Sequence, residues 1–138
     1  LQNATARFDR EKSWVFYHGE VAYSKLIQYY SNANLGVFAS SCENLPNILL
    51  ETMASGLPIV CSDNGPMPEI LDESGLYFDP ENPKSIFKTL QKLISSPDLR
   101  SKLANGSFSL AQKYSWNKCA NDTMQFLSDV VIDFKSKQ

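Results

Sequence analysis

Short apolar runs alternate with amphipathic stretches along most of the chain. Four runs have the mostly apolar character of strands that are buried on both faces, and they cover residues 14–17, 35–39, 58–61 and 76–78. Apolar residues recur at helical spacing over 23–33, and the segments 46–55 and 67–71 also suit helices. This alternation predicts an α/β fold with a parallel sheet and right-handed crossovers.

The last third of the chain is predicted to be helical. Asn82 and Ser96 each precede a proline, and Ser115 precedes a long apolar stripe, so all three suit the start of a helix. We expect the helices over about 83–134 to pack on the sheet. The stripe is favoured as a core or domain-packing surface, because the polar face of this segment is not rich in the lysine and arginine typical of a membrane-surface helix.

Glu43 and Glu51 stand on either side of a predicted helix start. Pro46 suits the first helical turn, where its missing N–H would be unpaired anyway, and Gly56 ends the helix. Glu43 then lies in the loop after the 35–39 strand, and Glu51 lies about 7.5 Å along the helix axis. In parallel α/β sheets, ligands bind beyond the carboxyl ends of the strands.

This arrangement favours a diphosphate with a sugar on each side. A helix N-terminus offers unpaired N–H groups and a partial positive charge, and carboxylates accept hydrogen bonds from sugar hydroxyls. A metal site is not expected, because a hard cation needs several oxygen ligands at one point and this pair supplies too few. The alternative is an ordinary solvated pair with no ligand.

The segment around this pair resembles the donor-site region of the retaining GT-B glycosyltransferases of family four. Members read as a small residue and Glu, a helix opening on Gly or Pro, Leu-Leu-Glu-Ala-Met-Ala, Gly-Pro-Val-Val and a Gly-Gly-x-Pro-Glu loop. The corresponding segments here are Ser41-Cys42-Glu43, Asn44-Leu45-Pro46-Asn47, Leu49-Leu50-Glu51-Thr52-Met53-Ala54, Leu57-Pro58-Ile59-Val60 and Gly65-Pro66-Met67-Pro68-Glu69. The match continues through residues 16–21 and 75–80, so it covers most of the chain.

The resemblance implies a Rossmann-like three-layer αβα domain, the C-terminal half of a GT-B fold without its first strand or strands. Members carry the acceptor site in an N-terminal domain, and their C-terminal domain opens with a basic Gly-Arg and Lys-Gly region that holds the donor phosphates. Residues 1–12 show no such region. We therefore expect residues 1–138 to form a single nucleotide-sugar-binding domain, a fragment of a two-domain enzyme.

The resemblance also assigns roles at the site. Glu43 matches the catalytic-site acid that contacts hydroxyls of the donor hexose, and Glu51 matches the acid that contacts the nucleotide ribose. The backbone N–H groups of Asn47 and Ile48 match those near the diphosphate.

A weaker match concerns the nucleobase. Val21 follows the Gly19 turn and matches a position beside the base through main-chain contact. Two departures from the family pattern concern prolines: Pro46 stands where many relatives have glycine and offers no donor to a ligand, and Pro66 replaces the second glycine of its loop and stiffens it.

Composition and charge exclude other classes. Thirteen basic and fifteen acidic residues give a net charge of −2, whereas a nucleic-acid surface needs a basic stripe. No apolar run approaches the roughly 20 residues that cross a bilayer. The three cysteines are odd in number and lack metal-ligand spacing, which fits a reducing cytosol. We expect a cytoplasmic protein, at the inner face of the membrane if it is membrane-associated at all.

The function implied is transfer of a sugar from a nucleotide diphosphate sugar to a hydroxyl acceptor with retention, in cell-surface polysaccharide or glycolipid synthesis. No metal or other cofactor is required, and the fragment alone is expected to bind donor weakly and to be inactive. A GT-B sugar-nucleotide epimerase and a non-catalytic nucleotide-sugar or interaction module are the alternatives. The only histidine, His18, and the helix-start acid Glu69 are favoured as structural.

Overall fold

The computed structural model describes residues 5, 7–9, 11 and 13–137. The chain divides into two compact units, Leu1–Asn32 and Ala33–Gln138. Each unit is described by itself below. The expectation of one domain over residues 1–138 stays a prediction.

In the first unit, a buried carboxylate accepts backbone N–H groups that a strand would donate to its neighbour. Asp9 accepts hydrogen bonds from the backbone N–H groups of Ser13 (3.0 Å), Trp14 (2.8 Å) and Val15 (2.7 Å). Desolvation acts to raise the pKa of this carboxyl group, but the hydrogen bonds outweigh it and lower the pKa to about 2. The helix α2 (Tyr23–Asn32) completes the unit as the sequence predicts.

The strand predicted over residues 14–17 is wrong, since this segment is irregular. A strand needs backbone partners on a neighbouring strand, and the N–H groups of Trp14 and Val15 donate to Asp9 instead. Trp14 and Phe16 are each 66% exposed, whereas a buried strand would cover such side chains.

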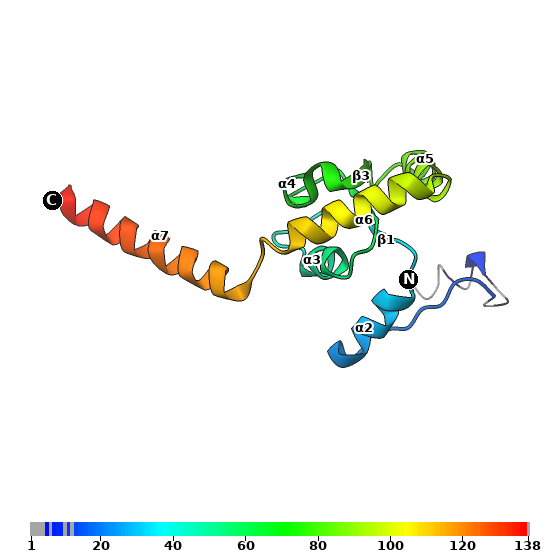
Figure 1. The fold of residues 1–138 in the computed structure, drawn as a ribbon, viewed down its shortest axis with the longest axis horizontal. Helices are drawn as coiled ribbons and strands as arrows, with labels where there is room; N and C mark the ends of the chain where they lie inside the picture. The colour runs from blue at the N-terminus through cyan, green and yellow to red at the C-terminus, as the bar shows by residue number, and fades with distance from the viewer. Residues whose placement is uncertain (1–4, 6, 10, 12, 138) are drawn as a thin grey trace. The chain divides into compact units, whose positions relative to one another are not determined.

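In the second unit, three parallel strands form an open sheet in the order β1-β2-β3. Figure 1 labels β1 and β3 beside α6. They are β1 (Gly36–Phe38), β2 (Ile59–Ser62) and β3 (Gly75–Phe78). Val37 pairs with Val60, and Val60 pairs with Leu76. Three of the four predicted strands are therefore confirmed.

The helices of the second unit begin where the sequence predicts. They are α3 (Asn47–Ala54), α4 (Met67–Leu71) with the 3₁₀ turn η1 (Asp72–Ser74), α5 (Pro83–Ile94), α6 (Pro97–Ala111) and α7 (Trp116–Ser136). The side chains of Asn82, Ser96 and Ser115 accept backbone N–H bonds at the starts of α5, α6 and α7. Each side chain satisfies a donor that a helix start leaves unpaired.

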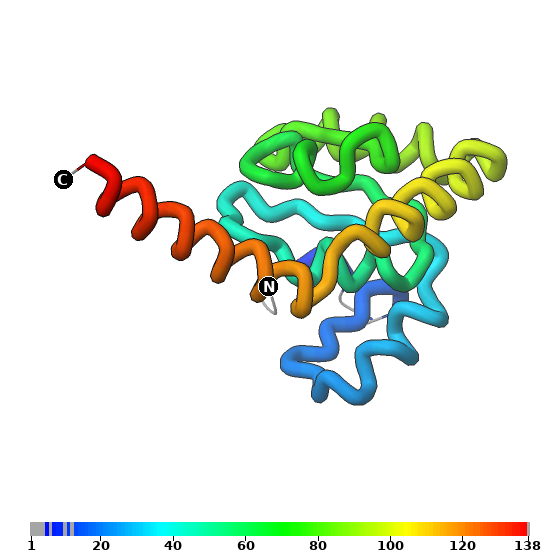
Figure 2. Tube along the Cα trace, turned by 60° about the vertical axis from the view of Figure 1, so that its left-hand side comes forward, coloured from blue at the N-terminus to red at the C-terminus, as the bar shows by residue number. Residues whose placement is uncertain are grey.

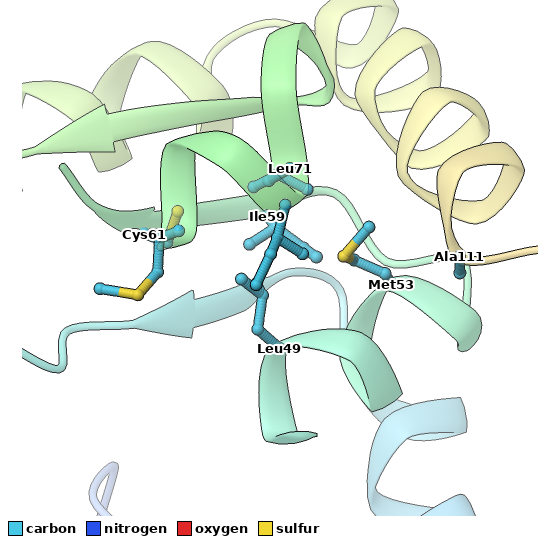
Figure 3. Packing of buried hydrophobic residues seen from close by; sticks show 8 residues of the cluster. Leu49, Met53, Ile59, Cys61, Leu71 and Ala111 are labelled. Atoms are coloured by element: carbon cyan, nitrogen blue, oxygen red, sulfur yellow. The ribbon is translucent and has the colours of Figure 1, made fainter. Parts of the chain in front are cut away.

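The core lies on both faces of β2, which confirms the three-layer αβα fold. Ile59 and Cys61 face one cluster with residues of α3, α4 and α6, as Figure 3 shows. Val60 faces the opposite cluster, which contains Phe78 of β3, Leu93 of α5 and Leu103 of α6. Successive residues of a strand point to opposite faces, so the fully buried β2 has a helix layer on each side.

Helices α5 and α6 contact the strands, and α6 also packs against α3 and α5 (Figure 2). All residues of α7 are described and none is buried, so the expected packing of 116–134 on the sheet is not observed. Its apolar residues follow the helical period, but packing also needs a facing surface, and the core clusters of this unit contain no residue of α7. None of the helices among the described residues is long and apolar enough to cross a membrane.

We predict that Ser107→Ala lowers the free energy of unfolding by about 1–3 kcal/mol, measured by urea denaturation. The fully buried Ser107 hydroxyl bonds the carbonyl of Leu57, 50 residues away and just before β2, at 3.0 Å. Its loss leaves that carbonyl without the partner. Ser109→Ala is the matched control, because the exposed Ser109 hydroxyl bonds only the Asn105 carbonyl within α6. Equal stability of the two variants would contradict the prediction.

Candidate functional site

The three parallel strands end at the same edge of the sheet, and their following loops form the candidate site. These loops are residues 39–46 after β1, 63–66 after β2 and 79–82 after β3. The first and second loops lie near each other, because a Cβ atom placed on Gly65 would be 3.7 Å from the carbonyl oxygen of Glu43. The loop after β2 is tied to β3 by the N–H of Asp63, which donates to the Phe78 carbonyl at 2.9 Å.

The start of α3 lies directly after the Glu43 loop. Pro46 is the buried residue before the first helical turn, and no side chain caps this helix. The Asn47 N–H donates to the Leu45 carbonyl at 3.0 Å, so a ligand would have to compete with that bond. The Ile48 N–H has no acceptor in the described part of the chain. Of the two expected backbone donors, Ile48 is therefore the available one.

Helix α3 presents its predicted site residues away from the core. Leu49 and Met53 are fully buried in the core cluster (Figure 3), whereas Asn47 and Ile48 are exposed and Glu51 is half-buried. Residues three and four apart share a helix face, so Glu51 lies one turn beyond this pair, about 6 Å along the axis from Asn47.

Glu43 is half-buried in the loop that leads to α3. Its carboxylate forms no hydrogen bond or ion pair with any described residue. This carboxylate is thus available to accept hydrogen bonds from a ligand. The structure brings Glu43 and the α3 start to one edge of the sheet, as the sequence predicted.

Val21, Gly19 and His18 belong to the first unit. Gly19 has a left-handed backbone (φ 66°), as a tight turn requires. The roles of Val21 and Gly19 beside a nucleobase stay predictions. His18 contacts Tyr29, whose hydroxyl lies 3.4 Å from Nδ1 and whose ring meets the imidazole edge to face.

The site has acids but few candidates for other chemistry. Burial, together with the nearby charge of Asp63, raises the pKa of the Cys61 thiol to about 12, so this thiol stays protonated and is a poor nucleophile. Within the described residues, no three His, Cys, Asp or Glu side chains converge on a point where a metal could bind. The edge can therefore accept hydrogen bonds at carboxylates and donate them at the helix start.

The charged side chains that follow the strand ends are all acidic. No lysine or arginine occurs between Lys25 and Lys84, whereas Glu43, Asp63 and Asp79 all follow strand ends. Beside these acids, the partial positive charge at the start of α3 is the main attraction for phosphate that this segment offers. Tight diphosphate binding needs cationic side chains from elsewhere.

The family model for "Glycosyl transferases group 1" matches residues 11–109. The chain belongs to this family. The match includes Glu43, Glu51 and the loops after β1, β2 and β3, so the candidate site lies inside the family region.

Two similar curated proteins are named as glycosyltransferases. The "O-antigen chain mannosyltransferase B" of Escherichia coli is 27% identical over 113 residues, which are 82% of this chain and 30% of that protein. The "D-inositol 3-phosphate glycosyltransferase" of Streptomyces bingchenggensis is 24% identical over 80% of this chain and 25% of its own length. The chain thus spans less than a third of these relatives.

Two solved structures share the fold. Sucrose-phosphate synthase from Thermosynechococcus elongatus superposes with a TM-score of 0.82 at 21% identity, covering 96% of this chain and 34% of that one. The C-terminal domain of a glycosyl transferase group 1 family protein from Francisella tularensis gives a TM-score of 0.68 at 26% identity, covering 81% of this chain and 58% of that one. The fold is that of GT-B glycosyltransferases.

Proposed function

We propose that this chain is the donor-binding part of a retaining glycosyltransferase that moves a hexose from a nucleotide diphosphate sugar to a hydroxyl acceptor. One observation carries the proposal: within a glycosyltransferase family match, the Glu43 carboxylate lies at the same edge of a parallel sheet as the Ile48 N–H, which has no acceptor among the described residues. A carboxylate suits sugar hydroxyls and a helix-start N–H suits a phosphate oxygen.

In this proposal the donor spans the start of α3. The diphosphate accepts a hydrogen bond from the Ile48 N–H. The hexose hydroxyls donate hydrogen bonds to Glu43, and the ribose hydroxyls donate them to Glu51. The protein orients the sugar and stabilises charge on the leaving diphosphate. Val21 and Gly19 are proposed to lie beside the nucleobase.

The chemical step needs no protein nucleophile. The acceptor oxygen bonds the anomeric carbon on the face from which the diphosphate leaves. The bond from that carbon to the phosphate oxygen breaks, its electron pair stays on the diphosphate, and a phosphate oxygen takes the acceptor's proton. No metal takes part in this scheme, in which cationic side chains outside the strand-end loops are proposed to bind the phosphates.

The biological setting is proposed from the relatives. One relative is named an O-antigen chain mannosyltransferase, and another, from Campylobacter jejuni, is named for transfer of N-acetylgalactosamine to a diphospho-undecaprenol-linked sugar. We propose polysaccharide or glycolipid synthesis in the cytoplasm, at the inner face of the membrane. The acceptor would bind an N-terminal domain, so the chain alone should turn over little.

A thermal-shift screen tests this function. UDP-glucose, UDP-N-acetylglucosamine, GDP-mannose and ADP-glucose are added to the chain and to the full-length protein. A true donor raises the Tm, because a ligand at 100 times its Kd stabilises the folded state by about 2.7 kcal/mol. The shift should be larger for the full-length protein. No shift in either protein with any of the four would count against the proposal.

A further inference from the structure

The outer face of helix α5 carries three lysines, and the helix contains no acid. Lys84, Lys88 and Lys92 follow one another at four-residue spacing, so they line one side of the helix within about 12 Å along its axis. All three are exposed, and none forms an ion pair with any described residue. Their charges are therefore available to an anionic partner.

The opposite face of α5 is fixed to the core. Leu93 is fully buried in the cluster that contains Val60 and Phe78. The Thr89 hydroxyl donates to the carbonyl of Tyr77 in β3 at 3.3 Å. These contacts set the rotation of the helix about its own axis, so the lysine side stays turned to solvent.

Two bulky apolar side chains lie beside the lysines. Phe87 and Ile94 are both exposed, and they stand seven residues apart, which is two helical turns on one side of α5. Lys84 and Gln91 lie between this pair and the other two lysines. Exposed apolar side chains next to a row of lysines suit a surface that offers both negative charge and hydrocarbon.

The other exposed amphipathic helix, α7, lacks this charge pattern. Residues 116–137 contain three lysines and three aspartates, so they carry no net charge. Two of these lysines form ion pairs, Lys118 with Asp122 and Lys137 with Asp133. Attraction to an anionic surface is therefore expected at α5 and not at α7.

The loop after β3 connects the candidate site directly to α5. Strand β3 ends at Phe78 at the site edge, and residues 79–82 lead into the helix start. The Asp79 N–H donates to the Ser85 hydroxyl at 3.2 Å, which ties this loop to the first turn of α5. A partner that covers the lysine side of α5 would thus lie next to the candidate site.

We propose that the α5 surface, formed by Lys84, Phe87, Lys88, Lys92 and Ile94, binds the anionic headgroups of a membrane. Each lysine near an anionic bilayer raises the partition coefficient about fivefold, and the cytoplasmic leaflet carries such charge. Phe87 and Ile94 insert at the boundary between headgroups and acyl chains. The candidate site is then held beside a lipid-linked acceptor, a consequence that rests on the proposed function.

Vesicle sedimentation of the full-length protein tests the α5 surface. The vesicles are phosphatidylcholine alone, or phosphatidylcholine with about one third phosphatidylglycerol, which is anionic. The unchanged protein should bind the anionic vesicles at least about tenfold better, and this preference should fall as salt is added. Equal binding to both kinds of vesicle would overturn the proposal.

The triple variant Lys84→Gln, Lys88→Gln, Lys92→Gln should lower the partition coefficient for anionic vesicles about 100-fold. Its matched control replaces the three lysines of residues 116–137 by glutamine, which changes the net charge by the same amount. The control should stay within about twofold of the unchanged protein, because exposed ion pairs contribute little. An equal loss in both variants would show an effect of net charge alone and would overturn the proposal.

A double variant separates a membrane from other polyanions. Phe87→Ala with Ile94→Ala keeps every charge and should weaken binding to anionic vesicles about tenfold. Unchanged vesicle binding in this variant would overturn the insertion step. Binding of a short DNA duplex that is lost in the lysine variant, without vesicle binding, would overturn the membrane as the partner.

The thermal-shift screen, run without vesicles, distinguishes this proposal from the proposed function. The lysine variant of α5 should show the same donor-induced rise in Tm as the unchanged protein. If no donor shifts the Tm but vesicle binding depends on α5, the proposed function fails and the membrane surface stands. If a donor shifts the Tm but vesicle binding does not depend on α5, the membrane surface fails.

Discussion

Phe78→Ala should lower the free energy of unfolding by about 3–5 kcal/mol, the largest stability effect that we expect from a single substitution. Phe78 is 1% exposed at the end of β3 and packs against Val60, Leu93 and Leu103. Removing the ring takes apolar surface from three elements at once and leaves a cavity that β2, α5 and α6 can close only in part. Folded domains are stable by about 5–15 kcal/mol, so this is a large share of the total.

Phe87→Ala is the control, because Phe87 lies on α5 of the same unit but is 63% exposed. Its loss should change stability by no more than about 0.5 kcal/mol. Urea denaturation followed by far-ultraviolet circular dichroism measures both variants, since Trp14 and Trp116 are exposed and would report poorly on the core by fluorescence. A loss below about 1 kcal/mol for Phe78→Ala would contradict the packing described.

The central strand of the sheet could be predicted from the sequence because it is buried on both faces. Residues 58–61 form a continuous apolar run, and β2 is buried at every position. Such a run needs no information from distant residues. The helix starts could also be predicted, because the side chains of Asn82, Ser96 and Ser115 accept hydrogen bonds from N–H groups only two or three residues away.

The strand expected at 14–17 shows where this reasoning fails. Its aromatic residues and its valine fit a strand at least as well as the residues of β3 do. What decides the outcome is the carboxylate of Asp9, which takes the N–H groups of Trp14 and Val15. A side chain that competes for backbone donors in this way depends on how the chain turns, and the apolar pattern does not contain that information.

Contacts between distant segments also could not be predicted from the sequence. The sequence predicted that Glu43 and residues 62–65 both follow strand ends, but not that a Cβ atom placed on Gly65 would lie 3.7 Å from the Glu43 carbonyl oxygen. Nor could it show that the Asn47 N–H is taken by the Leu45 carbonyl. The apolar period of α7 predicted a helix correctly. Whether its apolar stripe is buried depends on contacts with distant residues, which a local pattern does not describe, and none of its residues is buried.

Glu43→Gln in the full-length protein should lower the affinity for the nucleotide sugar by about 10- to 100-fold and leave the affinity for the nucleotide diphosphate unchanged. A hydrogen bond to a charged acceptor contributes about 1.5–3 kcal/mol, and each 1.4 kcal/mol is a factor of ten in Kd. The amide keeps the size of the side chain but removes its charge. Isothermal titration calorimetry with both ligands gives the ratio directly.

The same substitution should leave the fold intact. The Glu43 carboxylate has no hydrogen bond or ion pair with any residue that the structure describes, so its loss should cost no more than about 0.5 kcal/mol. Glu73→Gln is the control, because Glu73 is exposed in η1, before β3, while the candidate site follows the strand ends. It should change neither stability nor affinity.

Comparison with Glu51→Gln assigns the two acids to the two sugars of the donor. Glu51 is proposed to bind the ribose, which the nucleotide diphosphate and the nucleotide sugar share. Substitution of Glu51 should therefore lower the affinity for both ligands by the same factor. Glu43 is proposed to bind the hexose, which only the nucleotide sugar carries. If Glu43→Gln weakened both ligands equally, or neither, the carboxylate of the loop after β1 would not be the group that holds the hexose.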